Sequence, residues 1–290
     1  MIGQKEVLKQ IDNLIEKGFP RFIVITGQRG QGKTELAKYI FHKLDEYYAT
    51  PEPDNRGGIY MVEIEHKIDD IREMIQMAYK QTEPIIYLIQ DADKMSIGAK
   101  NSLLKVIEEP PQQAFFIMEL QQIENTLETI KSRCQEIKME QYTDEELIKF
   151  LPENLSGEDK VIITDIASNK YQVDLLLKYN PKEFYNYVDK VVNNIYRVQS
   201  ANSFKIAEKL DLKDDGNGYD LRLFFITFRV ICFEKAQVLL DIEDEKENFN
   251  SYIQSCNITA NYMNKLDING INKQSLVDMW ILDIRKEWLK

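Results

Sequence analysis

Apolar residues in the first half of the chain fall into short continuous runs that alternate with stripes of helical spacing. The runs predict a buried strand at 22–25, a central strand of a parallel sheet at 85–89, and further strands near 59–64 and 114–118. The stripes predict helices between these strands. This alternation, from residue 21 to about 140, predicts an open α/β structure with a parallel sheet and helices on both faces.

The pattern changes after Tyr142. Residues 143–146, Thr-Asp-Glu-Glu, form a capping box that opens a helix. From there to Lys290 the apolar spacing predicts helices and almost no strand, with loops rich in Gly, Asn and Asp between them. We therefore expect three domains: an α/β domain at 1–142, a small helical domain at 143–195 and an all-helical domain at 196–290.

A glycine-rich segment between the first strand and the next helix, 27–34, fits the pattern G-x-x-x-x-G-K-[ST]. Its backbone N–H groups are expected to surround a polyphosphate at the positive end of the helix, whereas a plain glycine turn beside an exposed lysine is the alternative. In this pattern Lys33 reaches the β and γ phosphates and the Thr34 hydroxyl binds Mg²⁺. We expect ATP or ADP with Mg²⁺ to be bound by Gly27, Gly30, Gln31, Gly32, Lys33 and Thr34.

Hydrolysis of the nucleotide requires a further acidic group at the end of a neighbouring strand. Here the strand at 85–89 runs into Gln90, which brings no negative charge to a divalent ion, and Asp91 is the next acid. Either Asp91 serves as a shifted Mg²⁺ ligand and catalytic acid, or the site binds nucleotide and hydrolyses it poorly.

Further motifs follow one another along the first half of the chain. They are Ile2-Gly3-Gln4, Ile68-Asp69-Asp70-Ile71-Arg72, Asp91-Ala92-Asp93-Lys94-Met95, residues 99–111 (AKNSLLKVIEEPP) and Ser132-Arg133-Cys134. With the phosphate loop, they make the chain resemble the AAA+ clamp-loader subunits of bacterial DNA polymerase III, and within that family its delta-prime branch. The resemblance covers residues 2–140 and continues beyond them only in helical character.

The resemblance implies an α/β P-loop (AAA+) domain followed by a helical lid and an all-helical collar. It also implies that Arg133 reaches the nucleotide of a neighbouring subunit as an arginine finger, whereas spacing alone equally allows an arginine that caps the preceding helix. The metal-binding and catalytic acids of the family fall on Gln90 and Asp91. Gln172 stands where ATP-hydrolysing relatives carry a sensor arginine. An intact phosphate loop beside two weakened catalytic positions resembles the stator of the loader more than its motor.

These inferences lead us to expect a delta-prime-like stator that binds ATP, hydrolyses it weakly and lends Arg133 to a neighbour. The partners implied by the resemblance are gamma/tau-type motor subunits, a delta-type clamp-opening subunit, the sliding clamp and, through the complex, primed DNA. Two alternatives stay open. One is a self-sufficient gamma/tau-like AAA+ ATPase that acts as an oligomer and uses Asp91 for its metal; the other is a scaffold that binds no nucleotide.

The 290 residues carry 37 basic and 48 acidic side chains, for a net charge of −11. Such a charge argues against wrapping of nucleic acid or an anionic membrane, so we expect the lone chain to bind DNA weakly. The three cysteines lie too far apart for a zinc pair, and the four-cysteine module of many relatives is missing, so no zinc is expected. Without a signal peptide or a sufficiently apolar span, the sequence predicts a cytoplasmic protein that contacts no membrane.

Overall fold

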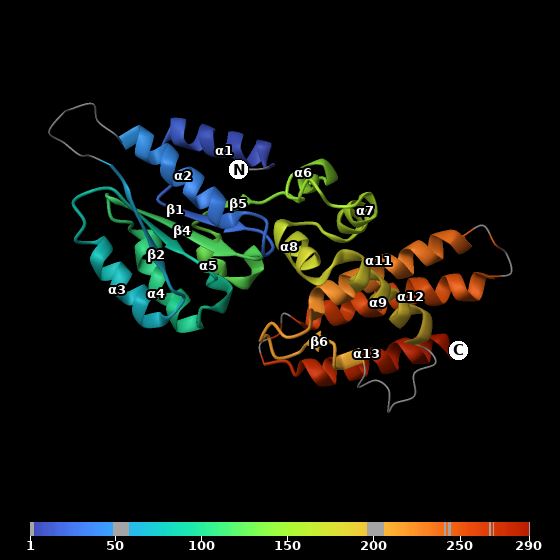
Figure 1. Cartoon of the computed structure of the whole chain (residues 1–290). Helices are drawn as coiled ribbons and strands as arrows, with labels where there is room; N and C mark the ends of the chain where they lie inside the picture. The colour runs from blue at the N-terminus through green and yellow to red at the C-terminus, as the bar shows by residue number, and fades with distance from the viewer. Residues whose placement is uncertain are drawn as a thin grey trace. The chain divides into compact units, whose positions relative to one another are not determined.

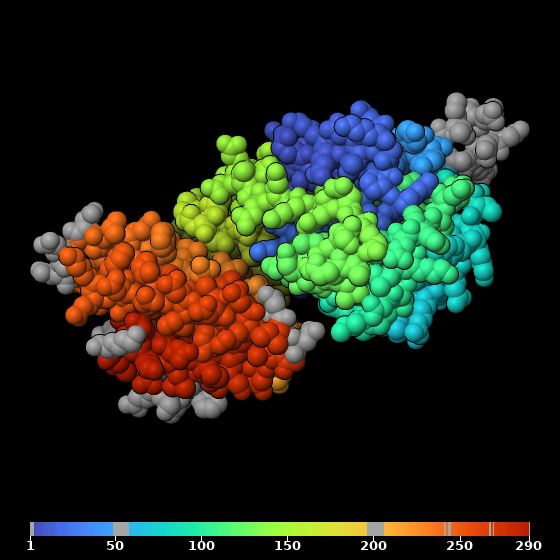
Figure 2. All heavy atoms as spheres, turned by 180° about the vertical axis from the view of Figure 1, so that it is seen from behind, coloured from blue at the N-terminus to red at the C-terminus, as the bar shows by residue number. Residues whose placement is uncertain are grey.

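The computed structural model describes most of the chain; the residues outside the description are 1–2, 49–57, 196–205, 241, 243–244, 267, 269 and 290. The chain forms two compact units (Figures 1 and 2). The first consists of Met1–Lys149 with Asn169–Tyr171, and the second of Phe150–Ser168 with Gln172–Lys290. The expected boundary at 195/196 adjoins residues outside the description, so the division into three domains stays a prediction.

The first unit is built on a sheet of five parallel strands in the order β2-β3-β4-β1-β5. The strands are β1 (Phe22–Thr26), β2 (Tyr60–Ile64), β3 (Ile85–Ile89), β4 (Ala114–Leu120) and β5 (Gln135–Lys138). Every residue of β1, β3 and β4 is buried, which confirms the strands predicted from continuous apolar runs. Strand β5 was not predicted; it is a short edge strand in which only Ile137 is fully buried.

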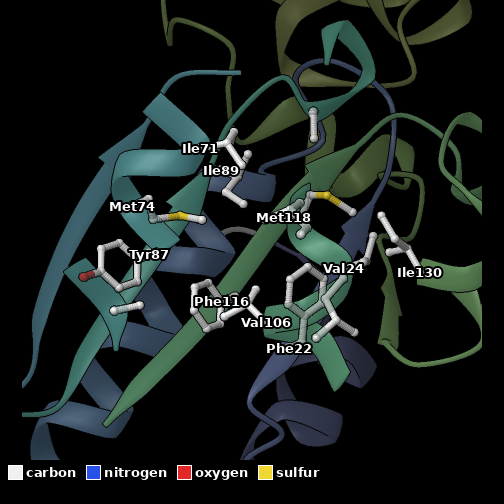
Figure 3. Close-up of a cluster of buried hydrophobic side chains, with 14 of the residues drawn as sticks. Phe22, Val24, Ile71, Met74, Tyr87, Ile89, Val106, Phe116, Met118 and Ile130 are labelled. Atoms are coloured by element: carbon white, nitrogen blue, oxygen red, sulfur yellow. The ribbon is translucent and has the colours of Figure 1, made fainter. Parts of the chain in front are cut away.

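Helices cover both faces of this sheet. They are α1 (Lys5–Lys17), α2 (Lys33–Tyr48), α3 (Ile68–Ala78), α4 (Ile97–Glu108) and α5 (Glu128–Lys131), with short 3₁₀ turns at Ala92–Lys94 and Ile123–Asn125. A further short helix, α6 (Asp144–Ile148), follows the last strand. One face packs against α1 and α2, and the other, with Tyr87, Phe116 and Met118, packs against α3, α4 and α5 (Figure 3). Parallel strands with helices on both faces confirm the predicted α/β class with a parallel sheet. The capping box that begins α6 is also present, with Thr143 Oγ1 accepting from the Glu146 N–H.

The second unit is helical. Its elements are α7 (Gly157–Ile166), α8 (Lys170–Tyr179, whose first two residues belong to the first unit), α9 (Pro181–Asn194), α11 (Leu221–Leu239), α12 (Lys246–Lys265) and α13 (Lys273–Trp288), with two-residue strands β6 (Leu210–Asp211) and β7 (Tyr219–Asp220). Its core gathers Phe224, Phe225 and Phe228 of α11 around the fully buried Trp280 of α13. These three phenylalanines of α11 are therefore core residues, whereas Phe233 near the end of the helix is 52% exposed. Among the described residues, no helix is long and apolar enough to cross a membrane.

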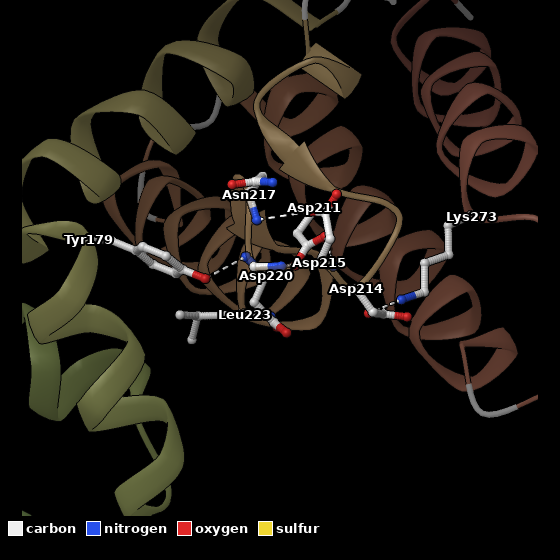
Figure 4. Close-up of polar contacts among 9 residues, drawn as sticks. Tyr179, Asp211, Asp214, Asp215, Asn217, Asp220, Leu223 and Lys273 are labelled. Carbon is white, nitrogen blue, oxygen red and sulfur yellow. Dashed lines mark hydrogen bonds and ion pairs between the residues drawn. The ribbon is translucent and has the colours of Figure 1, made fainter.

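An acidic loop joins β6 to β7 and holds local contacts of its own (Figure 4). Asp211 accepts hydrogen bonds from the backbone N–H groups of Asp215 and Gly216, at 3.1 and 2.8 Å. Asp214 pairs with Lys273, the first residue of α13. Asp220 caps α11 by accepting from the N–H of Leu223 at 2.7 Å. These carboxylates therefore fix the loop to the ends of two helices.

Two tryptophans tie α13 to α12, and we expect their hydrogen bonds to contribute unequally to stability. Trp280 Nε1 donates to Thr259 Oγ1 at 2.9 Å in the core, whereas Trp288 Nε1 donates to Ser255 Oγ at 3.0 Å from a half-buried position. Replacing Trp280 by phenylalanine leaves a buried hydroxyl without its donor, so the free energy of unfolding should fall by about 1–3 kcal/mol. Urea denaturation should show a smaller loss for Trp288→Phe; equal losses would contradict this.

Candidate nucleotide-binding site

The phosphate loop lies where the sequence predicts it, between the end of β1 and the start of α2 (Figure 1). The Lys33 ammonium donates to the carbonyl oxygens of Gly27 at 2.6 Å and Gln28 at 3.1 Å, so it points back over the loop. Burial lowers the pKa of Lys33, and the nearby acids, Glu119 first among them, oppose this shift. A half-buried ammonium above a loop of backbone N–H groups suits the phosphates of a nucleotide.

Gly30 is the point at which the loop meets the segment Asn169–Tyr171. Its φ of +83° lies in the left-handed region, and a Cβ at this position would stand 2.5 Å from the backbone nitrogen of Tyr171. The N–H of Lys170 donates to the Gly30 carbonyl at 3.2 Å. The guanidinium of Arg29 lies 4.3 Å from the centre of the Tyr171 ring. The contact therefore requires glycine, and it covers one side of the phosphate loop.

Gln31 is a buried residue of the phosphate loop that forms hydrogen bonds with the loop itself and with Tyr142. Its side-chain oxygen accepts from the Gln28 N–H at 2.5 Å, and its carbonyl oxygen accepts from the Tyr142 hydroxyl at 3.0 Å. The residue is 4% exposed. Gln31 therefore fixes the shape of the loop, and its side chain is already engaged within the chain.

A buried carboxylate, Glu119 on β4, lies beside the residue predicted to bind magnesium. Thr34 Oγ1 donates to Glu119 Oε2 at 3.3 Å, and Glu119 is 6% exposed. Burial raises the pKa of Glu119, and the hydrogen bond from Thr34 and the positive charge of Lys33 partly oppose this rise. We did not single out Glu119 from the sequence. The signal was present, because Phe115, Ile117 and Glu119 alternate on one face of a strand that is otherwise apolar.

The polar residues after β3 turn in different directions. Asp91 has a left-handed φ of +48°, and its carboxylate accepts from Lys94 Nζ at 2.7 Å. This hydrogen bond from Lys94 lowers the pKa of Asp91. Asp93 accepts from the Gln121 N–H and the Asn125 side-chain amide, which ties the turn to the end of β4. Asp91, the expected magnesium ligand, is therefore engaged by Lys94 in this structure, and its side chain is 66% exposed.

Gln172, at the expected sensor position, is engaged within the second unit. Its side-chain oxygen accepts from the N–H of Ser168 at 2.7 Å and from the Ser168 hydroxyl at 3.1 Å. Gln172 is 6% exposed. The amide carries no charge with which to attract a phosphate, and its oxygen holds the turn before α8.

Arg133 follows α5 and contacts its own chain. One terminal nitrogen donates to the Thr129 carbonyl at 3.1 Å and to Ser132 Oγ at 3.2 Å, and the other lies 3.2 Å from Glu108 Oε1 at the end of α4. Its side chain is 42% exposed. This position is compatible with both roles expected from the sequence. The contact with the last turn of α5 suits a helix cap, and the exposure to solvent suits an arginine finger.

The residues of the loop fit a magnesium-bound nucleotide triphosphate. Lys33 supplies a cation, the loop supplies backbone N–H groups, and Thr34 and Glu119 supply two oxygens of the kind that Mg²⁺ prefers. Glu119 Oε1 is buried and has no hydrogen-bond partner, which marks an acceptor whose partner is a ligand or water. The phosphate-loop motif thus lies at the end of a strand of a parallel sheet, and the binding of a nucleotide there stays a prediction.

Comparisons with known proteins find similarity to subunits of DNA polymerase III. A family model described as "DNA polymerase III, delta subunit" matches residues 48–143. The tau subunit of DNA polymerase III from Bacillus subtilis (strain 168) is 30% identical over 51% of this chain and 30% of its own length. The gamma subunit from Buchnera aphidicola of Schizaphis graminum is 31% identical over 58% of this chain and 53% of its own. Over these regions the chain is similar to subunits of DNA polymerase III.

The matched region is partial. The chain spans 30% and 53% of the length of these two curated relatives. Among solved structures, a gamma subunit-related protein from Thermotoga maritima aligns over 97% of this chain and 99% of its own, with 14% identity and a TM-score of 0.43. The RuvB branch migration motor of the same organism aligns over 83% and 77%, with 13% identity and a TM-score of 0.39.

Proposed function

We propose that this chain is a delta-prime-type stator of the clamp loader. It binds ATP or ADP with Mg²⁺ at the phosphate loop and hydrolyses ATP slowly by itself. The observation that carries this proposal is an intact loop, with Lys33 and Thr34 in place, beside two neutral side chains at catalytic positions. Gln90 directly follows β3 and carries no charge, and the amide oxygen of Gln172 accepts hydrogen bonds from Ser168.

In this proposal Arg133 acts on a neighbouring motor subunit. Its present contacts are one ion pair and two hydrogen bonds at the surface, and exposed pairs of this kind stabilise by about 1 kcal/mol or less. They can therefore be exchanged for a phosphate at small cost. A guanidinium on the γ-phosphate neutralises the charge that develops during hydrolysis. The nucleotide site of this chain and its arginine thus serve two different interfaces.

The proposed partners are gamma/tau-type motor subunits, a delta-type clamp-opening subunit and the sliding clamp. The similarity to subunits of DNA polymerase III supports such partners, because proteins of this kind work in a complex. With a net charge of −11, the chain is expected to reach primed DNA through the complex rather than alone. The proposed site of action is the cytoplasm.

A motor of the gamma/tau type is the second candidate. Two observations favour it: the curated relatives named above are gamma and tau subunits, and Asp91 directly follows Gln90. In such a motor Asp91 would leave Lys94 to bind the metal. The two candidates differ in what the chain does alone, since a motor hydrolyses ATP as an oligomer of itself.

Steady-state hydrolysis by the purified chain tests the proposal. We expect the chain alone to turn over ATP at least about a hundredfold more slowly than the reconstituted complex, because its own site lacks both a charged strand-end acid and a finger supplied by a neighbour. Rapid turnover by the isolated chain, abolished by Lys33→Ala, would instead establish the motor. The Lys33→Ala control separates turnover by this chain from that of a contaminant.

A further inference from the structure

Glu119 is a buried acid for which the proposed function has so far given no role. It is 6% exposed, one of its carboxylate oxygens contacts Thr34 and the other, Oε1, is buried with no hydrogen-bond partner. Leaving a buried charged acceptor unpaired is costly, so an unpaired oxygen at this depth marks a place where a ligand or a water binds. The Lys33 ammonium does not fill this role in the structure, because it donates to the carbonyls of Gly27 and Gln28.

The register of the sheet places Glu119 beside the position that lacks an acid. Strands β3 and β4 are parallel neighbours with Ile89 opposite Met118, so Gln90 comes opposite Glu119 one step further on. Ile89 and Met118 both point to the face covered by α3 and α4 (Figure 3). Glu119, the next residue of β4, lies on the opposite face, the face of α2 and Thr34. Gln90 is the first residue after β3, so Glu119 lies on the strand next to the one that Gln90 follows.

The two oxygens at this point are spaced like neighbouring ligands of one cation. Two oxygens bound at right angles to Mg²⁺, each about 2.1 Å from the ion, lie about 3.0 Å apart. Thr34 Oγ1 and Glu119 Oε2 are 3.3 Å apart. Asp91 is not placed in this way, because its carboxylate is paired with Lys94 and largely exposed.

We propose that Glu119, from the strand next to β3, supplies the carboxylate that Gln90 lacks and binds the Mg²⁺ of the nucleotide together with Thr34. The inference rests on the proposed function in so far as the phosphate loop binds a nucleotide. It gives the chain a way to retain magnesium and nucleotide while the position at the end of β3 stays neutral. Binding of the metal is thereby separated from the hydrolysis that an acid at Gln90 would support.

The test measures the affinity of a fluorescent methylanthraniloyl-ATP for the full chain, once with Mg²⁺ and once with EDTA. In wild type, Mg²⁺ is expected to tighten binding. In Glu119→Gln the affinity measured in EDTA should stay within about twofold of the wild-type value. The factor by which Mg²⁺ tightens binding should fall at least about tenfold, which is the usual loss of metal affinity when a group of a metal site is replaced. Electron paramagnetic resonance of Mn²⁺ with the nucleotide should show a matching loss of metal affinity.

Two further variants sharpen the result. Glu136→Gln is the matched control, because it neutralises another carboxylate of the same sheet. Glu136 lies on the edge strand β5 and accepts a hydrogen bond from Thr26 Oγ1 of β1. This variant should keep the full effect of Mg²⁺ on binding. Adding Gln90→Asp to Glu119→Gln should restore much of that effect. The thermal midpoint of Glu119→Gln without ligand should equal or exceed that of wild type, which shows that the variant is folded.

The other outcomes overturn the inference in distinguishable ways. An unchanged Mg²⁺ effect in Glu119→Gln would remove Glu119 from the metal site and leave nucleotide binding intact. Equal losses with Mg²⁺ and with EDTA would show that Glu119 acts on the loop or on Lys33 instead. If wild type binds no nucleotide in either buffer, nucleotide binding fails together with this inference, whereas assembly with partner subunits remains a separate question.

Discussion

Replacing Arg133 by alanine is expected to slow ATP hydrolysis at the adjoining motor subunit by about 10³-fold. The physical reason is the loss of a guanidinium that neutralises the charge developing on the γ-phosphate. The measurement is single-turnover hydrolysis in a complex that holds one motor subunit and this chain, so that a single interface contributes. The proposed finger also requires that ATP affinity changes far less than the rate, because the charge to be neutralised develops in the transition state.

Two controls separate a finger from a helix cap. Arg72→Ala removes an exposed arginine of α3 that lies 3.7 Å from Asp69 and should leave the rate unchanged. Arg133→Lys keeps the positive charge but loses the planar fork, so it should restore the rate only partly. If the Arg133→Ala complex assembles and hydrolyses ATP at the wild-type rate, Arg133 does no more than contact the last turn of α5.

Replacing Lys33 by alanine is expected to weaken ATP binding by the chain at least about a hundredfold. Charge-assisted hydrogen bonds to two phosphates stabilise by about 3 kcal/mol or more, and 1.4 kcal/mol corresponds to a factor of ten. The half-buried position of Lys33 above the loop limits screening by salt. Titration with the fluorescent ATP analogue measures the change directly.

The control for Lys33 lies on the same helix. Lys38 is an exposed lysine of α2, and Lys38→Ala should bind the analogue like wild type. Wild-type affinity in Lys33→Ala, with a thermal midpoint near that of wild type, would show that the loop does not cradle phosphates. In that case the chain is a scaffold that binds no nucleotide, the third interpretation that the sequence allows.

The sequence was sufficient for those parts of the fold that depend on local patterns. Strands β1, β3 and β4 were predictable because each is an unbroken apolar run buried on both faces. Strand β5 was not, because three of its four residues are polar or charged and it pairs with β1 alone. An edge strand of this kind has no periodic signal and forms only where its neighbour provides hydrogen bonds.

In the candidate site, too, the features set by neighbouring residues could be predicted from the sequence, and those set by distant contacts could not. The phosphate loop could be predicted because all of its parts lie within eight residues. The packing of Tyr171 against Gly30 could not, since the two are far apart in the chain and no periodicity relates them. The pairing of Asp91 with Lys94 depends on a left-handed backbone angle that the sequence does not reveal. Glu119 gave a readable signal, a charge at a buried strand position, and its meaning depends on the register with Gln90.

The central claim is that this chain is a stator that joins motor subunits, and assembly tests it most directly. The chain is mixed with gamma/tau-type motor and delta-type subunits, and the mixture is separated by size-exclusion chromatography with light scattering. The account predicts one stoichiometric complex, a pentamer, that contains this chain and whose ATPase activity depends on Arg133. Elution of this chain apart from a complex that the other subunits form without it would contradict the account.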